Sequence, residues 1–249
     1  MSLEHVKQTF EDAGREDPFY AVFTDHARKG GKWDHDEFFA HGRNEIESVL
    51  QYVRSSVSAI PMNNALDFGC GVGRLTQALG DHFDRVVGVD ISNSMVEAAN
   101  RYNRKGNRVR YVVNEAPHLR AFSNSQFEFI YSNITLQHVP PEPALAYVSE
   151  FVRLLCPGGV AVFQMRIGAR VKPGTLSALL YRFRREHLRR FWKRLRGRIP
   201  YEMHVVSRQQ VTEVVKQARG RIVDVVDVSR QLNGSSLRFA VMRPAEQLV

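Results

Sequence analysis

The sequence predicts an α/β fold in which a mostly parallel, seven-stranded sheet lies between helices on both faces. A short apolar strand at residues 65–68 runs into a glycine-rich turn and then into the start of a helix. A second strand of the buried type, at residues 85–90, ends in an acid, Asp90. Strand and helix patterns alternate along most of the remaining chain, which is the order that a doubly wound sheet requires.

Apolar periodicity and capping residues predict the helices. In residues 43–58, apolar side chains recur at helical spacing, and Pro61 follows before the first strand. Other helices are expected after the glycine turn as far as Leu79, at 95–102 with Ser92 or Asn93 as cap, at 141–155, and at 207–218 with Ser207 as cap. The seven expected strands are 65–68, 85–90, 109–113, 127–131, 160–165, 221–228 and 236–242.

The turn after the first strand has the spacing G-x-G-x-G, formed by Gly69, Gly71 and Gly73. Glycines allow positive φ and have no Cβ, so a ligand can lie directly against the backbone. Nicotinamide and flavin nucleotides instead use G-x-G-x-x-G, with a helix N-terminus free for the diphosphate. Asp67, two residues before the first glycine, would repel a diphosphate but suits a ligand with an ammonium group.

Asp90 lies 17 residues after Gly73, where a ribose diol is bound in a doubly wound sheet. Its carboxylate can accept hydrogen bonds from both hydroxyls. A nucleoside site that favours a positively charged ligand without phosphate fits S-adenosylmethionine, which has a sulfonium, an amino group and no phosphate.

Four motifs resemble those of the class I S-adenosylmethionine-dependent methyltransferases, in particular the broad small-molecule type. They occur in the family's order and spacing at residues 66–73, 88–95, 127–132 and 154–159. The resemblance covers residues 44–167 and resumes from His204. It implies a Rossmann-like fold with an antiparallel last strand, S-adenosyl-L-methionine as cofactor and S-adenosyl-L-homocysteine as product.

The resemblance also implies cofactor contacts. In relatives, the acid after the third strand meets the adenine amine, and the next backbone amide meets a ring nitrogen. Glu115 and Ala116 hold these positions, although an aspartate is more usual than Glu115, and an exposed turn acid is the alternative. Arg43 or Trp33 is expected at the methionine carboxylate. The cofactor-binding residues expected in all are Asp67, Gly69, Cys70, Gly71, Gly73, Asp90, Ile91, Met95, Glu115, Ala116, Asn133, Arg43 and Trp33.

Substrate contacts are expected beyond the fourth strand, because ligands of open α/β sheets bind outside the carboxyl ends of the strands. His138 and His204 are the candidate general bases, since histidine titrates near neutrality. Each can instead serve to hold a loop in place. The expected substrate-binding residues are Tyr20, Gln137, His138, Glu202 and His204. No His/Cys spacing motif predicts a metal site.

The length of 249 residues fits one domain. We expect an N-terminal cap at 1–43, a cofactor-binding core at 44–166, a basic helical insertion or lid at 167–203, and the rest of the core at 204–249. No apolar run approaches the ~20 residues of a membrane span. The N-terminus lacks a signal-peptide pattern, and Cys70 and Cys156 read as reduced packing residues. A cytoplasmic protein is expected.

The net charge of +9 is concentrated in the insertion, where residues 166–198 contain twelve of the 35 Lys and Arg residues and one acid, Glu186. Residues 176–198 read as a basic amphipathic helix with Phe and Trp on its apolar side. It can be a lid with solvated arginines, a helix lying on the inner surface of an anionic membrane, or a polyanion site. Nucleic acid is the less favoured partner because no RNA-binding motif accompanies the charge.

The sequence therefore predicts a methyltransferase that transfers a methyl group to oxygen or nitrogen of a small-molecule or lipid-linked acceptor. An in-line displacement on a reactive sulfonium depends mainly on alignment and exclusion of water. Two alternatives stay open. One is an RNA methyltransferase that uses the basic insertion, and the other is a non-catalytic cofactor-binding protein that docks on a membrane or partner.

Overall fold

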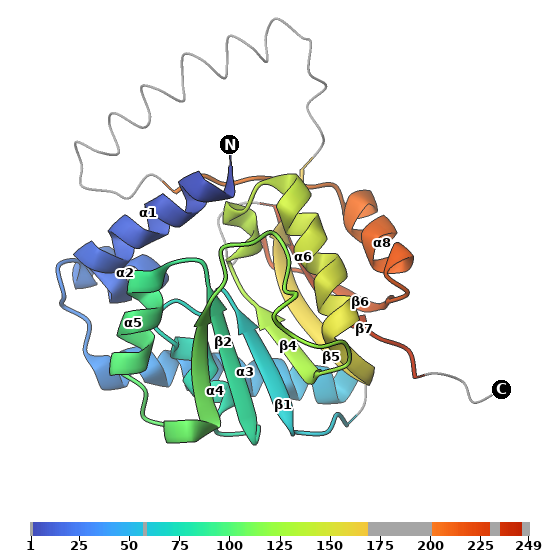
Figure 1. Ribbon diagram of the computed structural model, residues 1–249, viewed down its shortest axis with the longest axis horizontal. Helices are drawn as coiled ribbons and strands as arrows, with labels where there is room; N and C mark the ends of the chain where they lie inside the picture. The colour runs from blue at the N-terminus through green and yellow to red at the C-terminus, as the bar shows by residue number, and fades with distance from the viewer. Residues whose placement is uncertain (1, 57–58, 169–200, 230–234, 246–249) are drawn as a thin grey trace, which may run out of the picture.

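The computed structural model describes residues 2–56, 59–168, 201–229 and 235–245, which form a sheet covered by helices on both faces (Figure 1). The strand order is β3-β2-β1-β4-β5-β7-β6. The strands are β1 Asn64–Phe68, β2 Arg85–Asp90, β3 Val109–Val113, β4 Phe127–Ser132, β5 Leu155–Arg166, β6 Arg221–Asp227 and β7 Ser236–Met242. β7 runs antiparallel to both of its neighbours, and the other pairings are parallel. The predicted seven-stranded sheet is confirmed.

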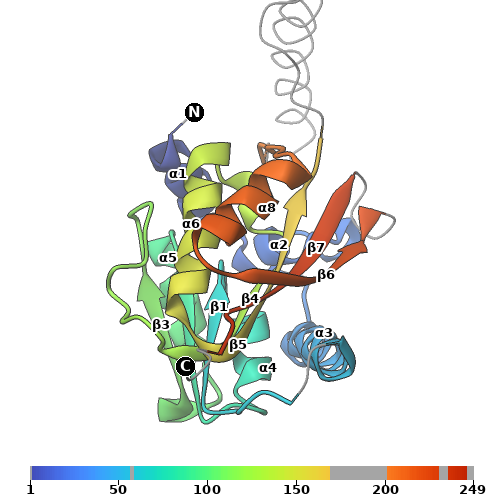
Figure 2. The ribbon, with the colours of Figure 1, turned by 90° about the vertical axis from the view of Figure 1, so that its right-hand side faces the viewer.

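The helices fall into two layers and an N-terminal group. They are α1 Leu3–Glu16, α2 Pro18–Val22, α3 His35–Ser56, α4 Arg74–Leu79, α5 Asn93–Arg101, α6 Pro141–Leu154 and α8 Arg208–Gln217. Apolar residues of α3, α4 and α5 form one core with one face of the sheet. Those of α6 and α8, which lie side by side in Figure 2, form the second core on the opposite face.

Two helix starts follow from side-chain caps. The Ser92 hydroxyl accepts from the backbone N–H of Met95 at 3.2 Å, so Ser92 rather than Asn93 caps α5. Ser207 accepts from the N–H of Gln210 at 3.1 Å, and the Gln210 side chain accepts from the N–H of Ser207 at 3.0 Å. This reciprocal pair is a capping box, which satisfies two N–H groups that the helix leaves open.

Helix α3 begins at His35, eight residues before its predicted start. The Asp34 carboxylate accepts from the backbone N–H of Glu37 at 2.8 Å and so stabilises the first turn. Phe38 and Phe39 continue the buried face of the helix toward its start. The prediction from residue 43 was wrong because these aromatics were assigned to a separate extension.

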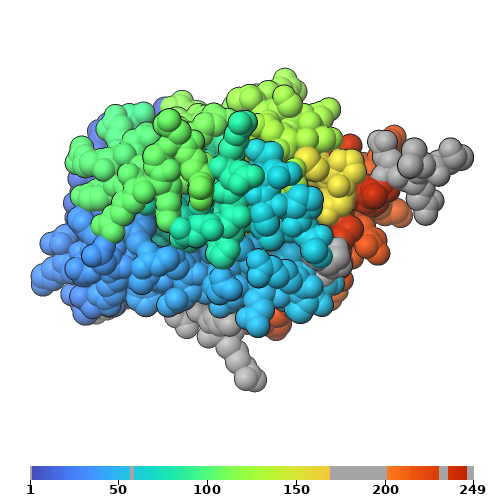
Figure 3. All heavy atoms as spheres, turned by 90° about the horizontal axis from the view of Figure 1, so that it is seen from below, coloured from blue at the N-terminus to red at the C-terminus, as the bar shows by residue number. Residues whose placement is uncertain are grey.

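The N-terminal segment packs along the first half of the core. In Figure 3 it is the blue surface that lies directly against the cyan and green residues of β1 to β3 and their connections. Its aromatic residues Phe19, Trp33, Phe38 and Phe39 form a third apolar cluster with Val72 and Met95 of the core. The segment is therefore fixed to the core by burial of aromatic surface.

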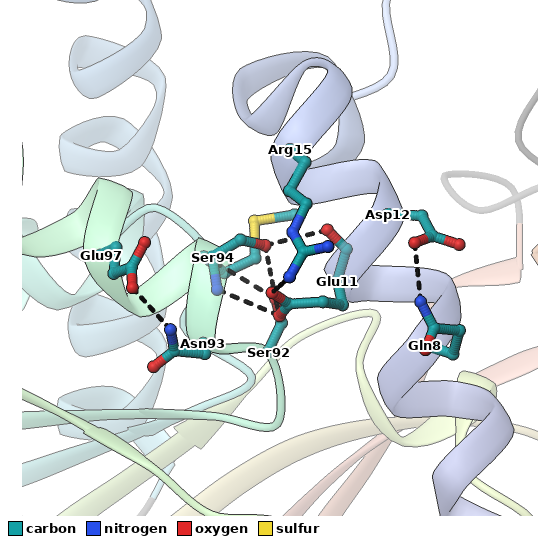
Figure 4. Close-up of polar contacts among 9 residues, drawn as sticks. Gln8, Glu11, Asp12, Arg15, Ser92, Asn93, Ser94 and Glu97 are labelled. Carbon is teal, nitrogen blue, oxygen red and sulfur yellow. Dashed lines mark hydrogen bonds and ion pairs between the residues drawn. The ribbon is translucent and has the colours of Figure 1, made fainter.

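A carboxylate in α1 fastens this helix to the start of α5 (Figure 4). The Glu11 side chain accepts from the Ser92 hydroxyl at 2.9 Å and from the N–H of Ser94 at 3.1 Å. The Ser94 hydroxyl donates in turn to the backbone carbonyl of Glu11 at 3.0 Å. These bonds lower the pKa of Glu11 against the opposing effect of burial, so the carboxylate stays ionised and α1 is held over the core.

The chain leaves the sheet after β5 and returns beside the same strand end, where Val206 N–H donates to the Arg166 carbonyl at 3.1 Å. The predicted amphipathic helix at 176–198 lies between these points, outside the described residues. Among the helices that the structure does describe, none has the length and apolar character needed to cross a membrane.

Candidate functional site

A cavity opens where β1, β2 and β4 end, between the glycine turn and the N-terminal helices. Leu3, Val6 and Phe10 of α1 cover it from above. Its remaining lining residues are Ala21, Val22, Phe68, Gly69, Cys70, Gly71, Arg74, Leu75, Val89, Asp90, Ile91, Met95, Asn114, Asn133, Ile134, Thr135, His138, Val139 and Tyr147. The sequence-predicted residues Gly69, Cys70, Gly71, Asp90, Ile91, Met95, Asn133 and His138 are thus brought together.

The glycine turn is held against β2, because the N–H groups of Gly69 and Cys70 donate to the Val89 carbonyl at 2.7 and 3.0 Å. Gly69 and Gly71 have φ of +80° and +51°. A Cβ on Gly71 would lie 2.3 Å from a methyl group of Val22, and one on Gly69 would lie 2.1 Å from the Thr135 hydroxyl. The glycines therefore permit close approach of the protein's own covering segments as well as of a ligand.

Gly73→Ala is expected to destabilise the fold more than Gly30→Ala. Both glycines have φ of +83°, so both variants carry the left-handed strain of roughly 1–2 kcal/mol. A Cβ on Gly73 would also lie 2.2 Å from the Tyr111 hydroxyl, whereas one on Gly30 would meet nothing within 4 Å. Overpacking should add about 1–3 kcal/mol at Gly73. Urea unfolding measures both free energies, and equal losses would contradict the packing role of Gly73.

Asp90 is partly buried at the end of β2, with its two carboxylate oxygens oriented by the backbone. Oδ2 accepts from the N–H of Gly71 at 2.8 Å, and Oδ1 accepts from the N–H of Ser92 at 3.0 Å. Burial raises the pKa of Asp90, while these backbone bonds act in the opposite direction. Each oxygen has a further lone pair, so the carboxylate can receive two hydroxyl groups of a ligand in the cavity.

Asp67 occupies a different place from the one predicted. Its side chain is buried beneath the turn, where Oδ2 accepts from the Thr76 hydroxyl at 2.6 Å, and Asp67 does not line the cavity. Burial raises the pKa of Asp67 to about 7. The sequence argument failed here because a strand that alternates between two faces of the sheet directs this carboxyl toward α4. The residue fixes the turn to the helix, and direct contact with a cofactor is not supported.

The connection after β3 also differs from the expectation. Glu115 is exposed and pairs with Lys7 of α1 at 3.0 Å, so it helps to hold α1 in place. Ala116 accepts at its carbonyl from the side chains of Asn114 and Tyr147 at 2.9 and 2.6 Å. Neither Glu115 nor Ala116 lines the cavity, whereas Asn114 does. Glu115 is therefore an exposed turn acid, which was the alternative interpretation of this residue.

Neither residue predicted for the methionine carboxylate lies in the cavity. Trp33 is buried in the aromatic cluster, where its indole N–H donates to the Phe23 carbonyl at 3.1 Å. Arg43 is exposed on α3 and lines a separate, shallower pocket. Gly73 also lies outside the lining, packed against Tyr111. None of these three residues lines the cavity, and their contacts with a cofactor stay predictions.

His138 lines the cavity just beyond β4. Its Nδ1 lies 2.8 Å from the Glu202 carbonyl, which can only accept, so Nδ1 carries the hydrogen and Nε2 has the lone pair. Nε2 lies 3.3 Å from the side-chain nitrogen of Gln137. Burial, helped by the charges of His204 and Arg166, lowers the pKa of His138 to about 4. The imidazole is therefore neutral near pH 7 and can accept a proton through Nε2.

Of the other predicted substrate residues, none lines the cavity, and Gln137, Glu202 and His204 lie around His138. Gln137 is buried, and its backbone carbonyl accepts from the N–H of His204 at 2.7 Å. Glu202 contributes its carbonyl to His138 and lines a small adjoining pocket. The Tyr20 hydroxyl lies 2.9 Å from Nδ1 of His26. Gln137, Glu202 and His204 thus support His138, whereas Tyr20 belongs to the N-terminal segment.

Sequence reasoning missed the lining residues of α1, together with Arg74, Asn114 and Thr135. A signal existed for α1, since Leu3, Val6, Phe10 and Ala13 recur at helical spacing. No comparable signal identifies Arg74 or Thr135, because their proximity to the cavity depends on how separate elements meet. Cys70 and Cys156 are both free, as predicted.

The residues present fit S-adenosylmethionine. Asp90 offers two oriented oxygens for a diol, and the lining beside it combines apolar side chains such as Ile91 and Met95 with the amide of Asn114, as a purine nucleoside requires. Gly69 and Gly71 reach the cavity lining, together with Val22 and Thr135, which lie against them. When bound, this cofactor supplies an electrophilic methyl group on a sulfonium.

Comparison with known proteins agrees with this fold and site. Residues 66–163 match a family model described as a methyltransferase domain, and these residues include the glycine turn, Asp90 and His138. This stretch, which runs from β1 into β5, is thus similar to a methyltransferase domain, and the sheet as a whole has the fold of solved methyltransferase structures.

Individual relatives match over part of their length. The demethylmenaquinone methyltransferase of Staphylococcus saprophyticus is 33% identical over 104 residues, which cover 40% of this chain and 43% of that protein. The ubiquinone biosynthesis O-methyltransferase of Methylococcus capsulatus is 30% identical over 142 residues, covering 57% of this chain and 58% of that protein. The chain spans about half the length of the curated relatives it matches.

Solved structures share the fold over most of the chain. The magnesium protoporphyrin IX methyltransferase of Synechocystis PCC 6803, crystallised with bound SAH, superposes with a TM-score of 0.61 over 97% of this chain and 99% of that one, at 18% identity. The cyclase SpnF superposes with a TM-score of 0.56 over 80% of this chain and 81% of its own, at 16% identity. Such identities show the fold alone, and the fold does not fix the reaction.

Proposed function

We propose that the protein transfers the methyl group of S-adenosylmethionine to oxygen or nitrogen of a small-molecule or lipid-linked acceptor. The observation that carries this proposal is the pair of oriented Asp90 oxygens beside the glycine turn, at the end of a cavity with largely apolar walls. A ribose diol satisfies this carboxylate, and a thioether or sulfonium ligand fits the apolar surface beyond it.

Two observations support an acceptor that is methylated on oxygen. His138 lines the cavity with a neutral imidazole whose Nε2 carries a lone pair, so it is the candidate to take up a hydroxyl proton during transfer. Two relatives are named for the biosynthesis of ubiquinone or the methylation of demethylmenaquinone, and the ubiquinone relative is named an O-methyltransferase. The apolar lining formed by Val6, Phe10 and Val139 is compatible with an acceptor of low polarity.

The proposal is tested by incubating the full chain with cofactor labelled in its methyl group and a cell extract. We expect label in the small-molecule or lipid fraction, and much less of it with Asp90→Ala when the cofactor is below saturation. Label in RNA would favour the RNA methyltransferase alternative. An absence of transfer to any fraction, with cofactor binding intact, would favour the non-catalytic alternative.

A further inference from the structure

Ile134, which lines the cavity just beyond β4, has a backbone conformation that isoleucine rarely adopts. Its φ is +62°. Of the other non-glycine residues in the described ranges, only Ser125 and Arg219 have a positive φ, at +55° and +63°. Two substituents on Cβ crowd the backbone in this left-handed region, so the conformation is a steric outlier for Ile134.

The other two positive φ angles have local explanations. Arg219 follows the end of α8, where its N–H donates to the Lys216 carbonyl at 2.9 Å and so closes the last turn of the helix. Ser125 lies in the turn before β4, where its N–H donates to the Arg153 carbonyl at 3.2 Å. Neither residue is branched at Cβ. Ile134 therefore carries the largest steric cost of the three.

The two neighbours of Ile134 are both fixed, and they impose the turn on the residue between them. The Asn133 amide donates to Oε1 of Glu45 at 2.7 Å. Thr135 packs against the glycine turn so closely that a Cβ on Gly69 would lie 2.1 Å from its hydroxyl oxygen. A strained backbone persists where the surrounding structure determines it in this way, and such positions cluster at functional sites.

Packing within the protein does not explain an isoleucine at this position. Ile134 is 38% exposed and belongs to none of the three apolar clusters formed by the described residues. Met203 and Val205 are the other large apolar residues of the described chain with such exposure, and neither lines the cavity. A ligand that covers Ile134 would therefore remove apolar surface from water at the cavity itself.

We propose that Ile134 determines acceptor specificity, and that its side chain packs on an apolar part of the methyl acceptor where the acceptor leaves the cavity. This inference rests on the proposed function. It narrows the acceptor to a molecule with an apolar extension beside the group that is methylated. The apolar lining at Val6, Phe10 and Val139 supports it, because an acceptor that covers these residues can continue onto Ile134.

The test uses phenol and 4-hexylphenol as probes, with S-adenosylhomocysteine present, in calorimetry on the full chain. We expect the wild type to bind 4-hexylphenol more tightly than phenol. Ile134→Asn should weaken the binding of 4-hexylphenol by about 3- to 7-fold, as when the exposed third of an aliphatic side chain is no longer covered. Its affinity for phenol and for S-adenosylhomocysteine should not change. Ile134→Leu, which is apolar but unbranched at Cβ, should keep the preference.

Two substitutions by asparagine serve as matched controls. Val205 is β-branched and 47% exposed but does not line the cavity, and Arg219 shares the positive φ at a remote helix end. Val205→Asn and Arg219→Asn should both keep the affinities of the wild type. Because asparagine tolerates the left-handed region, Ile134→Asn should unfold at a urea concentration at least as high as the wild type.

Unchanged binding of 4-hexylphenol by Ile134→Asn would overturn the proposal. Equal weakening of both phenols with a lower urea midpoint would show a structural role of Ile134 and would overturn it too. The same holds if the wild type binds the two phenols equally, or binds neither while it binds S-adenosylhomocysteine, and methyl transfer to a polar acceptor would then remain. Failure of the wild type to bind S-adenosylhomocysteine would contradict the proposed function itself, so the two failures are distinguishable.

Discussion

Asp90→Ala is expected to weaken the binding of S-adenosylhomocysteine by about 10- to 150-fold, which corresponds to a loss of ~1.5–3 kcal/mol for hydrogen bonds to a charged group. The reason is that the backbone N–H groups of Gly71 and Ser92 orient the two oxygens of Asp90, and no side chain in the described part of the chain donates to either oxygen. Calorimetry with the purified variant measures the change.

Asp84→Ala is the control for this experiment. Asp84 is exposed just before β2, at the opposite end of the strand from Asp90. Its removal changes the net charge by the same amount but should leave the affinity unchanged. Because Asp90 also orders the turn, the melting temperature of each variant must be measured. Unchanged affinity in a folded Asp90→Ala variant would refute the placement of the ribose.

His138→Ala is expected to lower kcat by about 10²- to 10⁴-fold for a hydroxyl acceptor, the usual range for general-base assistance. Binding of S-adenosylhomocysteine should be little affected, since the polar side-chain contacts of His138 are with Glu202 and Gln137 and not with Asp90 or the glycine turn. His204→Ala should have the smaller effect, because His204 does not line the cavity. The rate of methyl transfer to the acceptor identified with labelled cofactor provides the measurement.

The pH profile separates catalysis from a purely structural role of His138. Because burial lowers its pKa to about 4, kcat/KM should stay level from pH 8 to about 5 and decrease only near pH 4. In the unfolded chain the imidazole takes up its proton near pH 6.5, so the stability of the fold decreases as the pH falls from about 6.5 toward 4. Circular dichroism at each pH corrects for this loss. A break in kcat/KM near pH 6.5, or an equal effect of His204→Ala, would contradict the assignment.

Much of the fold could be predicted because its signals are local. The strands Val109–Val113 and Ser236–Met242 agree with their predicted bounds, and Ser207 caps α8 as expected. Alternation of apolar residues and a hydroxyl before a helix act over a few neighbouring residues, so the sequence shows them directly. The start of α3 was missed because Phe38 and Phe39 belong to both the helix and the aromatic cluster.

The candidate site likewise contains residues whose proximity could be predicted and residues whose proximity could not. Gly69, Gly71 and Asp90 follow strand ends, and parallel strands bring their carboxyl ends to one edge of the sheet, so their proximity was predictable. Arg74 and Glu45 come from different helices, and their meeting at Asn133 depends on the packing of α3 against α4 and β4. No spacing in the sequence encodes such a contact.

The amino-acid sequence by itself determined the order of strands and helices, the glycine turn and the acid at the end of β2, because each depends on the conformational preferences of adjacent residues. Only the tertiary structure decided that Asp67 points toward Thr76, that Glu115 pairs with Lys7 and that α1 covers the cavity with Phe10. The physical reason is that the direction of a side chain and the partner it finds are set by packing between segments distant in the chain.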